Sequence, residues 1–316
     1  MAEEQAVSRG MFPREPGVCA VVASHHPDLA LLAGLLEALE AQVGRVVVVD
    51  NATPGSALRE LCGTHPCVEL LPLPENRGLA TALNQGIARA RALPRVTHVL
   101  LMDQDSVPEA DMVPVLKAAL DRLSGHLRVA AVGPRFRDPR EGTAAPFVRI
   151  GFPFNRQLHC TGDHDEVACD FLITSGSLIP LAVLDGIGGM DDDLFIDNVD
   201  LEWCFRAVAK GYALFGVCGA RMRHHHGDER HHLPGVPRGI VVHPPRRLFY
   251  MMRNRLLLYR RAWTPKRWIA QDLPRLVVKF LLFALLVPPR RANLRCMVAG
   301  MRAGLAGRAS PPPDDA

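Results

Sequence analysis

The sequence predicts an α/β protein in which helices cover both faces of a mostly parallel sheet, followed by a helical C-terminal extension that is basic and apolar. Three observations lead to this prediction. Short apolar runs alternate with segments of helical periodicity through the first half of the chain. These runs are apolar throughout, which is typical of strands that are covered on both faces. The chain has 316 residues, of which 48% are hydrophobic, and this is ample for a large core.

Predicted strands and helices alternate in this half. The apolar runs predict strands at residues 18–23, 45–50, 68–73, 98–102 and 129–133. Apolar residues at helical spacing predict helices at 29–43, 78–93 and 110–124, and Asp28 is the expected N-cap of the first. Strands that are separated by helices in this way usually form a parallel sheet.

The pattern is less regular after residue 133. Loops predominate from 134 to 232, with short strands expected at 167–173 and 177–179 and a helix at 200–210. After Pro245 the sequence predicts a basic amphipathic helix at 246–261 and then an apolar stretch at 276–287, which Lys279 interrupts.

These patterns divide the chain into four expected regions. Residues 1–17 are expected to be a flexible N-terminal tail, 18–245 the α/β domain, 246–308 the helical extension and 309–316 a disordered tail.

Charge is distributed unevenly between the domain and the extension. Residues 246–308 contain fifteen Lys and Arg residues and one acid, a balance of +14, whereas the rest of the chain has a balance of −10. A nucleic-acid-binding protein would carry its basic surface on the folded domain, so we exclude nucleic acid as a partner. A basic amphipathic extension predicts peripheral contact with an anionic membrane; the alternative is that it packs on the domain. Its apolar stretch of about 12 residues is too short to span a bilayer.

The N-terminal residues and the cysteines indicate the cellular compartment of the protein. The first residues contain acids and no apolar stretch, unlike a secretory signal. The eight cysteines include no Cys-x-x-Cys pair, and several lie in apolar runs, so we expect reduced core cysteines and no disulfide or zinc framework. These features predict a cytoplasmic protein, peripheral on the inner face of the cell membrane, and they leave its oligomeric state open.

Carboxylates follow two of the predicted strands. Asp50 ends the run at 45–50, and Asp103 and Asp105 follow the run at 98–102. Ligands bind at the carboxyl ends of the strands in open parallel sheets. Two carboxylates at one edge repel each other unless a cation offsets the repulsion, and hard oxygen ligands suit Mg²⁺ or Mn²⁺. Each acid can also be only a turn former or a helix cap.

Two common nucleotide-binding signatures are absent. The first strand is not followed by Gly-x-Gly-x-x-Gly, and the chain has no Walker-type Gly-Lys-Ser/Thr sequence. Neither a dinucleotide-dependent oxidoreductase nor a P-loop enzyme is therefore supported.

A series of motifs occurs in a fixed order between residues 18 and 260. The motifs are VVVVDNAT, ENRGLATALNQGI, LLMDQDS, TSGSLI, FIDNVDLEWCFRA, MRHHHGD and RLFYMMRNRLLL. Together they resemble glycosyltransferase family 2, in particular its bacterial rhamnosyltransferase branch. The resemblance implies a GT-A-type, Rossmann-like fold and an inverting, metal-dependent enzyme that moves a sugar from a nucleoside diphosphate to a cell-surface glycan or lipid-linked acceptor.

The rhamnosyltransferase branch implies dTDP-L-rhamnose as the donor. One alternative is another sugar on the same scaffold, such as galactofuranose or a hexosamine from a UDP-sugar. A second alternative is a catalytically silent GT-A domain that acts as a binding subunit, and a third is a zinc-dependent module built on the histidines between residues 224 and 232.

The resemblance assigns residues to the donor side of the site. It implies that Asp50 accepts a hydrogen bond from the pyrimidine ring, and that Asn76, Gly78 and Asn84 belong to the nucleotide-binding loop and helix. Asp103 is implied to contact the ribose or a metal-bound water.

It also assigns the metal ligands and the base. Asp105 and one histidine before Gly-Asp are the implied ligands of Mg²⁺ or Mn²⁺; we assign His224, with His226 as the alternative. Asp200 is the implied catalytic base, which removes the proton of the acceptor hydroxyl. Asp197 and Glu202 lie near it in sequence and stay candidates, and Asp200 can also be only a helix cap.

The acceptor side is assigned in the same way. Ser175 and Gly176 match the acceptor-side loop of the family, and their alternative is a simple turn between short strands. Trp203 lies one turn after Asp200 and either lines the acceptor pocket or is an ordinary buried tryptophan.

Overall fold

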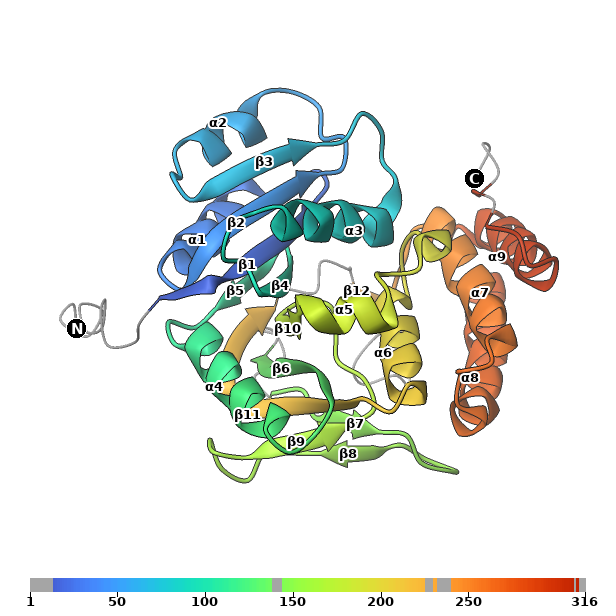
Figure 1. The fold of residues 1–316 in the computed structure, drawn as a ribbon. Helices are drawn as coiled ribbons and strands as arrows, with labels where there is room; N and C mark the ends of the chain where they lie inside the picture. The colour runs from blue at the N-terminus through green and yellow to red at the C-terminus, as the bar shows by residue number, and fades with distance from the viewer. Residues whose placement is uncertain (1–13, 138–143, 225–229, 232–239, 310, 313–316) are drawn as a thin grey trace, which may run out of the picture.

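The structure, a computed structural model, describes residues 14–137, 144–224, 230–231, 240–309 and 311–312. Within these residues, nine strands form one sheet with helices on both faces (Figure 1). The strand order is β3-β2-β1-β4-β10-β6-β11-β5, and β9 pairs with β11 beside this path. The α/β architecture predicted from the sequence is therefore present.

The N-terminal strands of this sheet are all parallel. They are β1 (Glu15–Ser24), β2 (Val43–Asp50), β3 (Val68–Pro72) and β4 (His98–Asp103). Ser24 of β1 pairs with Asp50, and Ala23 pairs with Asp103. The carboxyl ends of β1, β2 and β4 therefore meet at one edge, as expected for parallel neighbours.

Helices on the two faces explain why these strands are apolar throughout. The helices are α1 (Leu29–Glu40), α2 (Ala57–Gly63), α3 (Gly78–Arg91) and α4 (Met112–Ser124). Val18, Ala20 and Val22 of β1 pack in one core with α1 and α4, while Cys19 and Val21 pack in a second core with α3. Successive side chains of a strand point to opposite faces, so both must be apolar. Asp28 caps α1 as predicted, since its Oδ1 accepts hydrogen bonds from Ala30 N and Leu31 N.

The second half of the sheet is mixed. Its strands are β5 (Ser106–Pro108), β6 (Val129–Arg137), β9 (Glu166–Cys169), β10 (Ser177–Pro180) and β11 (Ala213–His224). β11 is parallel to β6, but β10 runs antiparallel to β4 and β6, and β5 and β9 run antiparallel to β11. The sheet is thus less parallel here than the sequence predicts, because short returning strands have no periodicity that shows their direction.

β11 is a strand that the sequence analysis does not predict. It contains Gly216 and Gly219, which are typical of turns. A Cβ at Gly216 would lie 2.2 Å from the ring of Phe147, so the glycine provides room for that ring within a strand. The local preference of glycine for turns is overridden here by the packing of Phe147 against the strand.

The remaining elements are short. They are β7 (Phe147–Arg149), β8 (Arg156–Leu158), α5 (Leu181–Ile187), the 3₁₀-helix η1 (Asp192–Leu194), α6 (Val199–Ala209), β12 (Arg230–His231) and β13 (Ile240–Val241). The expected tails at 1–17 and 309–316 lie largely outside the described residues.

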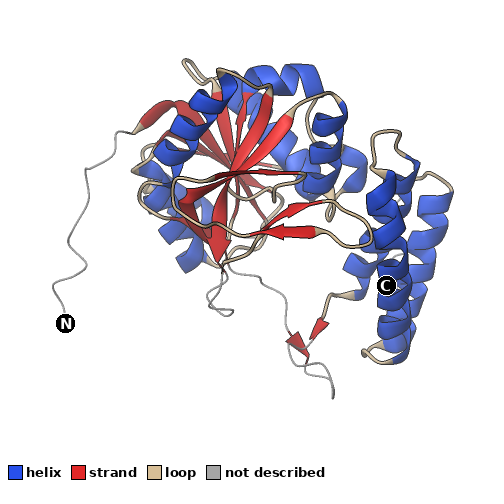
Figure 2. Cartoon of the chain, turned by 90° about the horizontal axis from the view of Figure 1, so that it is seen from below, coloured by secondary structure: helices blue, strands red, loops and turns tan. Residues whose placement is uncertain are grey.

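The C-terminal extension consists of three helices that lie together at one side of the molecule (Figures 1 and 2). They are α7 (Pro245–Arg260), α8 (Lys266–Leu285) and α9 (Arg290–Leu305). The sequence predicts α7 and the second half of α8, but it does not separate α9. In the described part of the chain, no helix combines the length and apolarity needed to cross a bilayer.

The prediction that the cysteines form no disulfide is wrong for one pair. Cys160 and Cys218 are bonded, with a Cα–Cα distance of 5.7 Å across 58 residues of sequence. Cys218 lies in β11, and its N–H donates to Asp165 O, which brings the loop before β9 onto the strand. The pairing depends on this long-range contact, which cysteine spacing does not reveal. Cys19, Cys62, Cys169, Cys204 and Cys296 are free and buried, as predicted.

Two helical glycines provide a matched test of the α7–α9 packing. A Cβ at Gly300 would lie 2.3 Å from Phe249 O on α7, so Gly300→Ala should lower the free energy of unfolding by about 1–3 kcal/mol. Nothing lies within 4 Å of a Cβ added at Gly34 in α1. Gly34→Ala should therefore raise the free energy of unfolding by up to about 1 kcal/mol. Chemical denaturation measures both, and a neutral Gly300→Ala would contradict the close α7–α9 contact.

Candidate active site

An open cavity of about 540 Å³ lies at the edge where β1, β2 and β4 end. Its lining comes from these strand ends, the start of α3, the loop before α6, the first turn of α6, the end of β11 and the start of α7. This is the place at which the sequence analysis expects a ligand.

The structure brings about half of the predicted site residues together in this cavity. Those that line it are Asn76, Gly78, Asp103, Asp105, Asp200 and His224. Those that do not line it are Asp50, Asn84, Ser175, Gly176 and Trp203.

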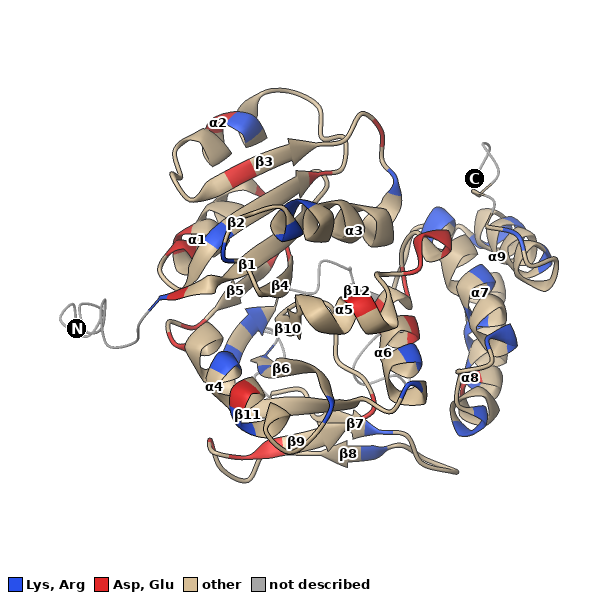
Figure 3. Cartoon of the chain, viewed as in Figure 1, with Lys and Arg blue, Asp and Glu red and all other residues tan. Residues whose placement is uncertain are grey.

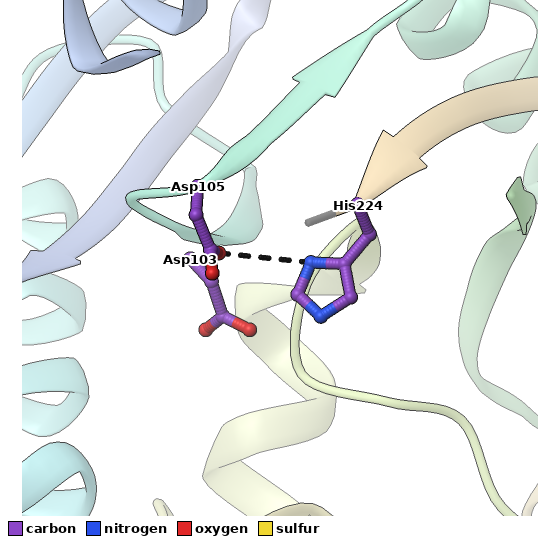
Figure 4. Close-up of side chains that lie close together, drawn as sticks. All are labelled: Asp103, Asp105 and His224. Atoms are coloured by element: carbon purple, nitrogen blue, oxygen red, sulfur yellow. Dashed lines mark ion pairs between the residues drawn. The ribbon is translucent and has the colours of Figure 1, made fainter. Parts of the chain in front are cut away.

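Asp103, Asp105 and His224 form a cluster of potential metal ligands (Figure 4). One ligand atom from each residue lies within 4.8 Å of the others, and His224 Nδ1 is 3.7 Å from Asp105 Oδ1. The antiparallel pairing of β5 with β11 places His224 opposite Ser106, and this pairing brings the histidine to the acids. The alternative ligand, His226, lies outside the described residues.

The electrostatics of this cluster favour a cation. Burial, together with the negative charges of Asp105 and Asp200, raises the pKa of Asp103 to about 7, against the opposing effect of Arg247. Two carboxylates and one imidazole at this spacing are a donor set that suits Mg²⁺ or Mn²⁺. The residues present therefore fit a divalent cation, whose charge would offset the repulsion.

A chain of buried hydroxyl groups holds the cluster from behind. Ser175 is fully buried, and its Oγ donates to Ser106 Oγ at 2.7 Å and accepts the N–H of Asp103 at 3.1 Å. Ser106 Oγ lies 2.6 Å from Nδ1 of His224. Ser175 therefore fixes the positions of Asp103 and His224, and its hydroxyl does not face the cavity.

Gly176 acts through its backbone. Its φ is +84°, its N–H donates to Leu101 O at 2.7 Å, and an added Cβ would lie 2.5 Å from the ring of Pro134. Only glycine adopts this conformation readily in so little space. This is the turn that reverses the chain into β10, while Thr174 of the same segment lines the cavity.

Asp200 is the second residue of α6, and it lines the same cavity as the cluster. The N-cap of α6 is Asn198, so Asp200 lies in the first turn and is not the cap. Its Oδ1 accepts the N–H of Leu201 at 2.8 Å. Burial is the main cause that raises its pKa to about 6, and Asp197 contributes.

The other two candidate bases are held in ion pairs. Asp197 Oδ1 is 3.1 Å from Arg247 Nη2, and Glu202, which is 1% exposed, lies 2.8 Å from Arg206. Trp203 is buried in the core, and its Nε1 donates to Gly188 O at 3.0 Å. The structure thus places Trp203 as an ordinary buried tryptophan.

Polar side chains form a network on the β1–β2 side of the cavity. Asn51 Nδ2 donates to Asn76 Oδ1 at 2.9 Å, and Asn51 Oδ1 accepts the N–H of Arg77 at 2.8 Å. His25 Nδ1 lies 2.8 Å from Asn51 O, and its Nε2 lies 3.0 Å from Asn76 Nδ2. His25, Asn51 and Asn76 all line the cavity, so this network gives that wall a polar surface.

Asp50, Gly78 and Asn84 support this wall. Asp50 is 8% exposed and accepts the N–H of Thr53 at 2.8 Å. Gly78 has a φ of +82°, and a Cβ there would lie 2.5 Å from Phe195 O. Asn84 exchanges hydrogen bonds with the backbone of Met190, so it holds the loop after α5.

The sequence analysis misses several residues that line the cavity. His25 and Asn51 directly follow β1 and β2, so extending the strand-end argument to every strand would have found them. Phe195, Asn198 and Arg247 have no such signal, because they reach the cavity only through the packing of α6 and α7.

Comparison with known sequences identifies the class of this protein as a glycosyltransferase. Residues 20–178 match the family described as Glycosyl transferase family 2. The chain is 30% identical over 249 residues to the dTDP-rhamnosyl transferase RfbF of Shigella flexneri, a match that spans 78% of this chain and 81% of that protein. It is 27% identical over 232 residues to an N-acetylglucosaminyl-diphospho-decaprenol L-rhamnosyltransferase of Mycobacterium tuberculosis, spanning 66% of this chain and 75% of the relative. The chain belongs to glycosyltransferase family 2, and it is similar to the rhamnosyltransferases of that family.

Solved structures show the same fold. A crystal structure of GalNAc-T7 with UDP, GalNAc and Mn²⁺ superposes with a TM-score of 0.58 at 11% identity, covering 92% of this chain and 56% of that one. S. aureus TarS gives a TM-score of 0.57 at 13% identity, covering 90% and 49%. The chain thus spans about half the length of these two proteins. The predicted GT-A-type fold is confirmed.

Proposed function

We propose that this glycosyltransferase moves L-rhamnose from dTDP-L-rhamnose to a cell-surface glycan or lipid-linked acceptor, with inversion and with a divalent cation. One observation carries the chemistry: Asp103, Asp105 and His224 cluster in the same cavity as Asp200. The choice of sugar is supported by the similar proteins, two of which are named as rhamnosyltransferases. Residues 18–245 form the catalytic domain in this proposal.

The donor nucleotide is proposed to lie along the wall formed by His25, Asn51 and Asn76. Asn76 and Gly78 present backbone and amide groups to the nucleotide, and Asp103 contacts its ribose or a metal-bound water. Asp50 lies at the end of β2, next to the wall residue Asn51 and 8% exposed, and it is proposed to accept a hydrogen bond from the pyrimidine ring where the nucleotide extends past the cavity lining. Asn84 acts indirectly, because its hydrogen bonds hold the loop around Met190.

Asp105 and His224 are the proposed ligands of Mg²⁺ or Mn²⁺. When bound, the cation neutralises negative charge on the departing diphosphate. The chain's own part is to keep these ligands in place, which the hydrogen bonds among Ser175, Ser106 and His224 support. Ser106 and Ser175 are buried behind the cluster. The proposed acceptor-side role of Ser175 and Gly176 is therefore to shape the loop that presents Thr174 to the cavity. Trp203 is proposed to support α6 from the core.

Asp200 is the proposed base. Its carboxylate takes the proton of the acceptor hydroxyl while the hydroxyl oxygen bonds to the anomeric carbon of the sugar. The attack comes from the face opposite the diphosphate. The bond between the anomeric carbon and the diphosphate oxygen breaks, and both of its electrons leave with that diphosphate oxygen. A pKa near 6 makes Asp200 a stronger base than an ordinary aspartate and keeps it mostly ionised at neutral pH.

The first prediction concerns donor and cation. Purified protein should release nucleoside diphosphate from dTDP-L-rhamnose in Mn²⁺ or Mg²⁺, faster than from UDP-galactofuranose or a UDP-hexosamine, and EDTA should abolish the release. Asp105→Asn should lower the rate by about 100-fold or more, because the cation is lost. Asp121→Asn, which removes an exposed acid paired with Lys117 on α4, is the matched control and should leave the rate unchanged. Full turnover in EDTA would refute the metal site, and preference for a UDP-sugar would refute only the choice of donor.

The second prediction concerns pH. Because the base must be ionised and its pKa is raised, the kcat of wild-type enzyme should fall as the pH drops below about 6. Asp200→Asn should lower kcat by about 10²–10⁴-fold. Asp185→Asn, at an exposed acid paired with Arg91, should keep both the rate and the pH profile. An Asp200→Asn enzyme with wild-type activity would refute the base assignment.

The extension at residues 246–308 is proposed to contact an anionic membrane through α8, which would place the protein peripherally on the inner face of the cell membrane. Side chains with about half or more of their surface exposed lie along this helix: Leu273, Val277, Val278, Leu281 and Leu285. Lys266, Arg267 and Arg275 of the same helix are exposed, and basic residues recur along α7–α9 (Figure 3). The one acid in the extension, Asp272, is 5% exposed and paired with Arg255 at 2.9 Å, so the exposed charge of this region is positive. An apolar helix face with a basic rim suits an anionic lipid surface.

The third prediction tests that face. The protein should cosediment with phosphatidylglycerol-containing vesicles, less so at high salt, and not with pure phosphatidylcholine. Val277→Glu together with Leu281→Glu should abolish this binding. Leu127→Glu is the control, at a residue that is 47% exposed on the catalytic domain, and this variant should still bind the vesicles. If the double variant instead converts a dimer into a monomer and keeps vesicle binding, the face is a contact between two copies of the chain.

A further inference from the structure

We propose that Arg253 and Asn254 of α7 are positioning residues for sugar transfer: they hold the loop at residues 193–198 in the conformation that sets Asp200 opposite the donor wall. The inference rests on the proposed role of Asp200 as the base. It assigns to the extension a part in the catalytic geometry, in addition to membrane contact.

The loop at 193–198 connects the two sides of the cavity. On the donor side, Phe195 O accepts the N–H groups of Leu79 and Ala80 at 2.6 and 3.3 Å, directly after Gly78. On the other side, Asn198 O accepts the N–H of Glu202 at 3.0 Å and so begins α6, which carries Asp200. The distance between the donor wall and Asp200 therefore depends on the conformation of this loop.

The loop is in a strained conformation. Phe195, Asp197 and Asn198 have φ values of 63°, 65° and 64°, in the left-handed region that residues with a side chain seldom adopt. Such a conformation persists only where the surrounding structure imposes it. Something outside the loop must supply that restraint.

α7 supplies it through buried hydrogen bonds. Asn254 is fully buried, and its Nδ2 lies within hydrogen-bond distance of the carbonyl oxygens of Leu194, Ile196 and Asp197, at 2.8, 2.7 and 2.9 Å. Arg253 is 1% exposed; its Nη2 donates to the carbonyls of Asp193 and Leu194, and its Nε donates to Asn254 Oδ1 at 3.0 Å. One pair of adjacent side chains thus contacts four consecutive or near-consecutive carbonyls of the loop.

Other contacts between α7 and the loop also restrain the loop. The ring of Tyr250 stacks on that of Phe195 with a centroid distance of 4.7 Å and an angle of 7°. Arg247 pairs with Asp197 at 3.1 Å. Arg247 also lines the cavity, so the start of α7 borders the site that the loop shapes.

A matched control lies in the same extension. Asn293 is also buried, at 1% exposure, and its Nδ2 donates to the carbonyls of Phe283 and Val287 at the end of α8. Asn254→Ala removes the side-chain donor to the carbonyls of Ile196 and Asp197, and Asn293→Ala removes the one to Phe283 and Val287, so both variants should have a lower melting temperature. Only Asn254 contacts the loop, so only its loss should alter the active site.

The experiment compares these two variants well below their melting temperatures. Asn254→Ala should lower kcat by about 10–100-fold, since a misplacement of roughly 1 Å is enough for such a loss. It should keep the Mn²⁺-induced rise in melting temperature, because Asp105 and His224 lie on other elements. Asn293→Ala should keep kcat within about 2-fold of wild type, a much smaller change than the loss expected for Asn254→Ala. Equal activity of the two variants would overturn the proposal.

Hydrogen exchange tests the positioning without any turnover. Amides at residues 79–80 and 195–202 should exchange faster in Asn254→Ala and at the wild-type rate in Asn293→Ala; unchanged exchange in Asn254→Ala would overturn the proposal. If Asn254→Ala does not fold, Arg253→Lys, which keeps the charge and loses the forked donor, is measured by the same criteria. An Asp200→Asn enzyme with wild-type turnover would refute the base role on which this inference rests, and the exchange result would then decide whether Asn254 positions the loop.

Discussion

Repulsion among carboxylates at one edge of the sheet is the constraint around which this molecule is organised. Asp103 shares one cavity with Asp105 and Asp200, and burial together with these two charges raises its pKa to about 7. Such a cluster persists only where the surrounding structure holds it and where a cation can offset its charge. The strand ends, the hydroxyl groups of Ser106 and Ser175, and the pairing of β5 with β11 supply the restraint.

The C-terminal helices have two different faces. α7 turns buried polar side chains toward the loop before α6, whereas α8 leaves an apolar face and basic side chains exposed. The two interpretations of the extension, packing on the domain and contact with lipid, are therefore compatible. A helical layer that is joined to the active-site loop on one side can present the other side to a surface, which would keep the cavity close to a lipid-linked acceptor.

Much of the fold can be predicted from the sequence because it depends on local periodicity. Valine-rich runs such as 45–50 need cover on both faces, and this requirement alone indicates strands between two helical layers. The predictions fail where local patterns carry no information on direction or partner. β10 is too short to show that it runs antiparallel, and the glycines of β11 are typical of turns, although here Gly216 makes room for Phe147.

The sequence by itself determined the apolar strands, the acids that follow them, the family to which their order belongs and the basic charge of the extension. The tertiary structure added how the pairing of β5 with β11 brings His224, already assigned with Asp105 by resemblance, to within 3.7 Å of that acid. Only the tertiary structure decided that Ser175 supports the cluster, that Cys160 reaches Cys218, and that Arg253 and Asn254 hold the loop before Asp200. The physical reason is that each of these contacts joins residues far apart in the chain, whose meeting depends on strand pairing and helix packing, while sequence patterns report only neighbours along the backbone.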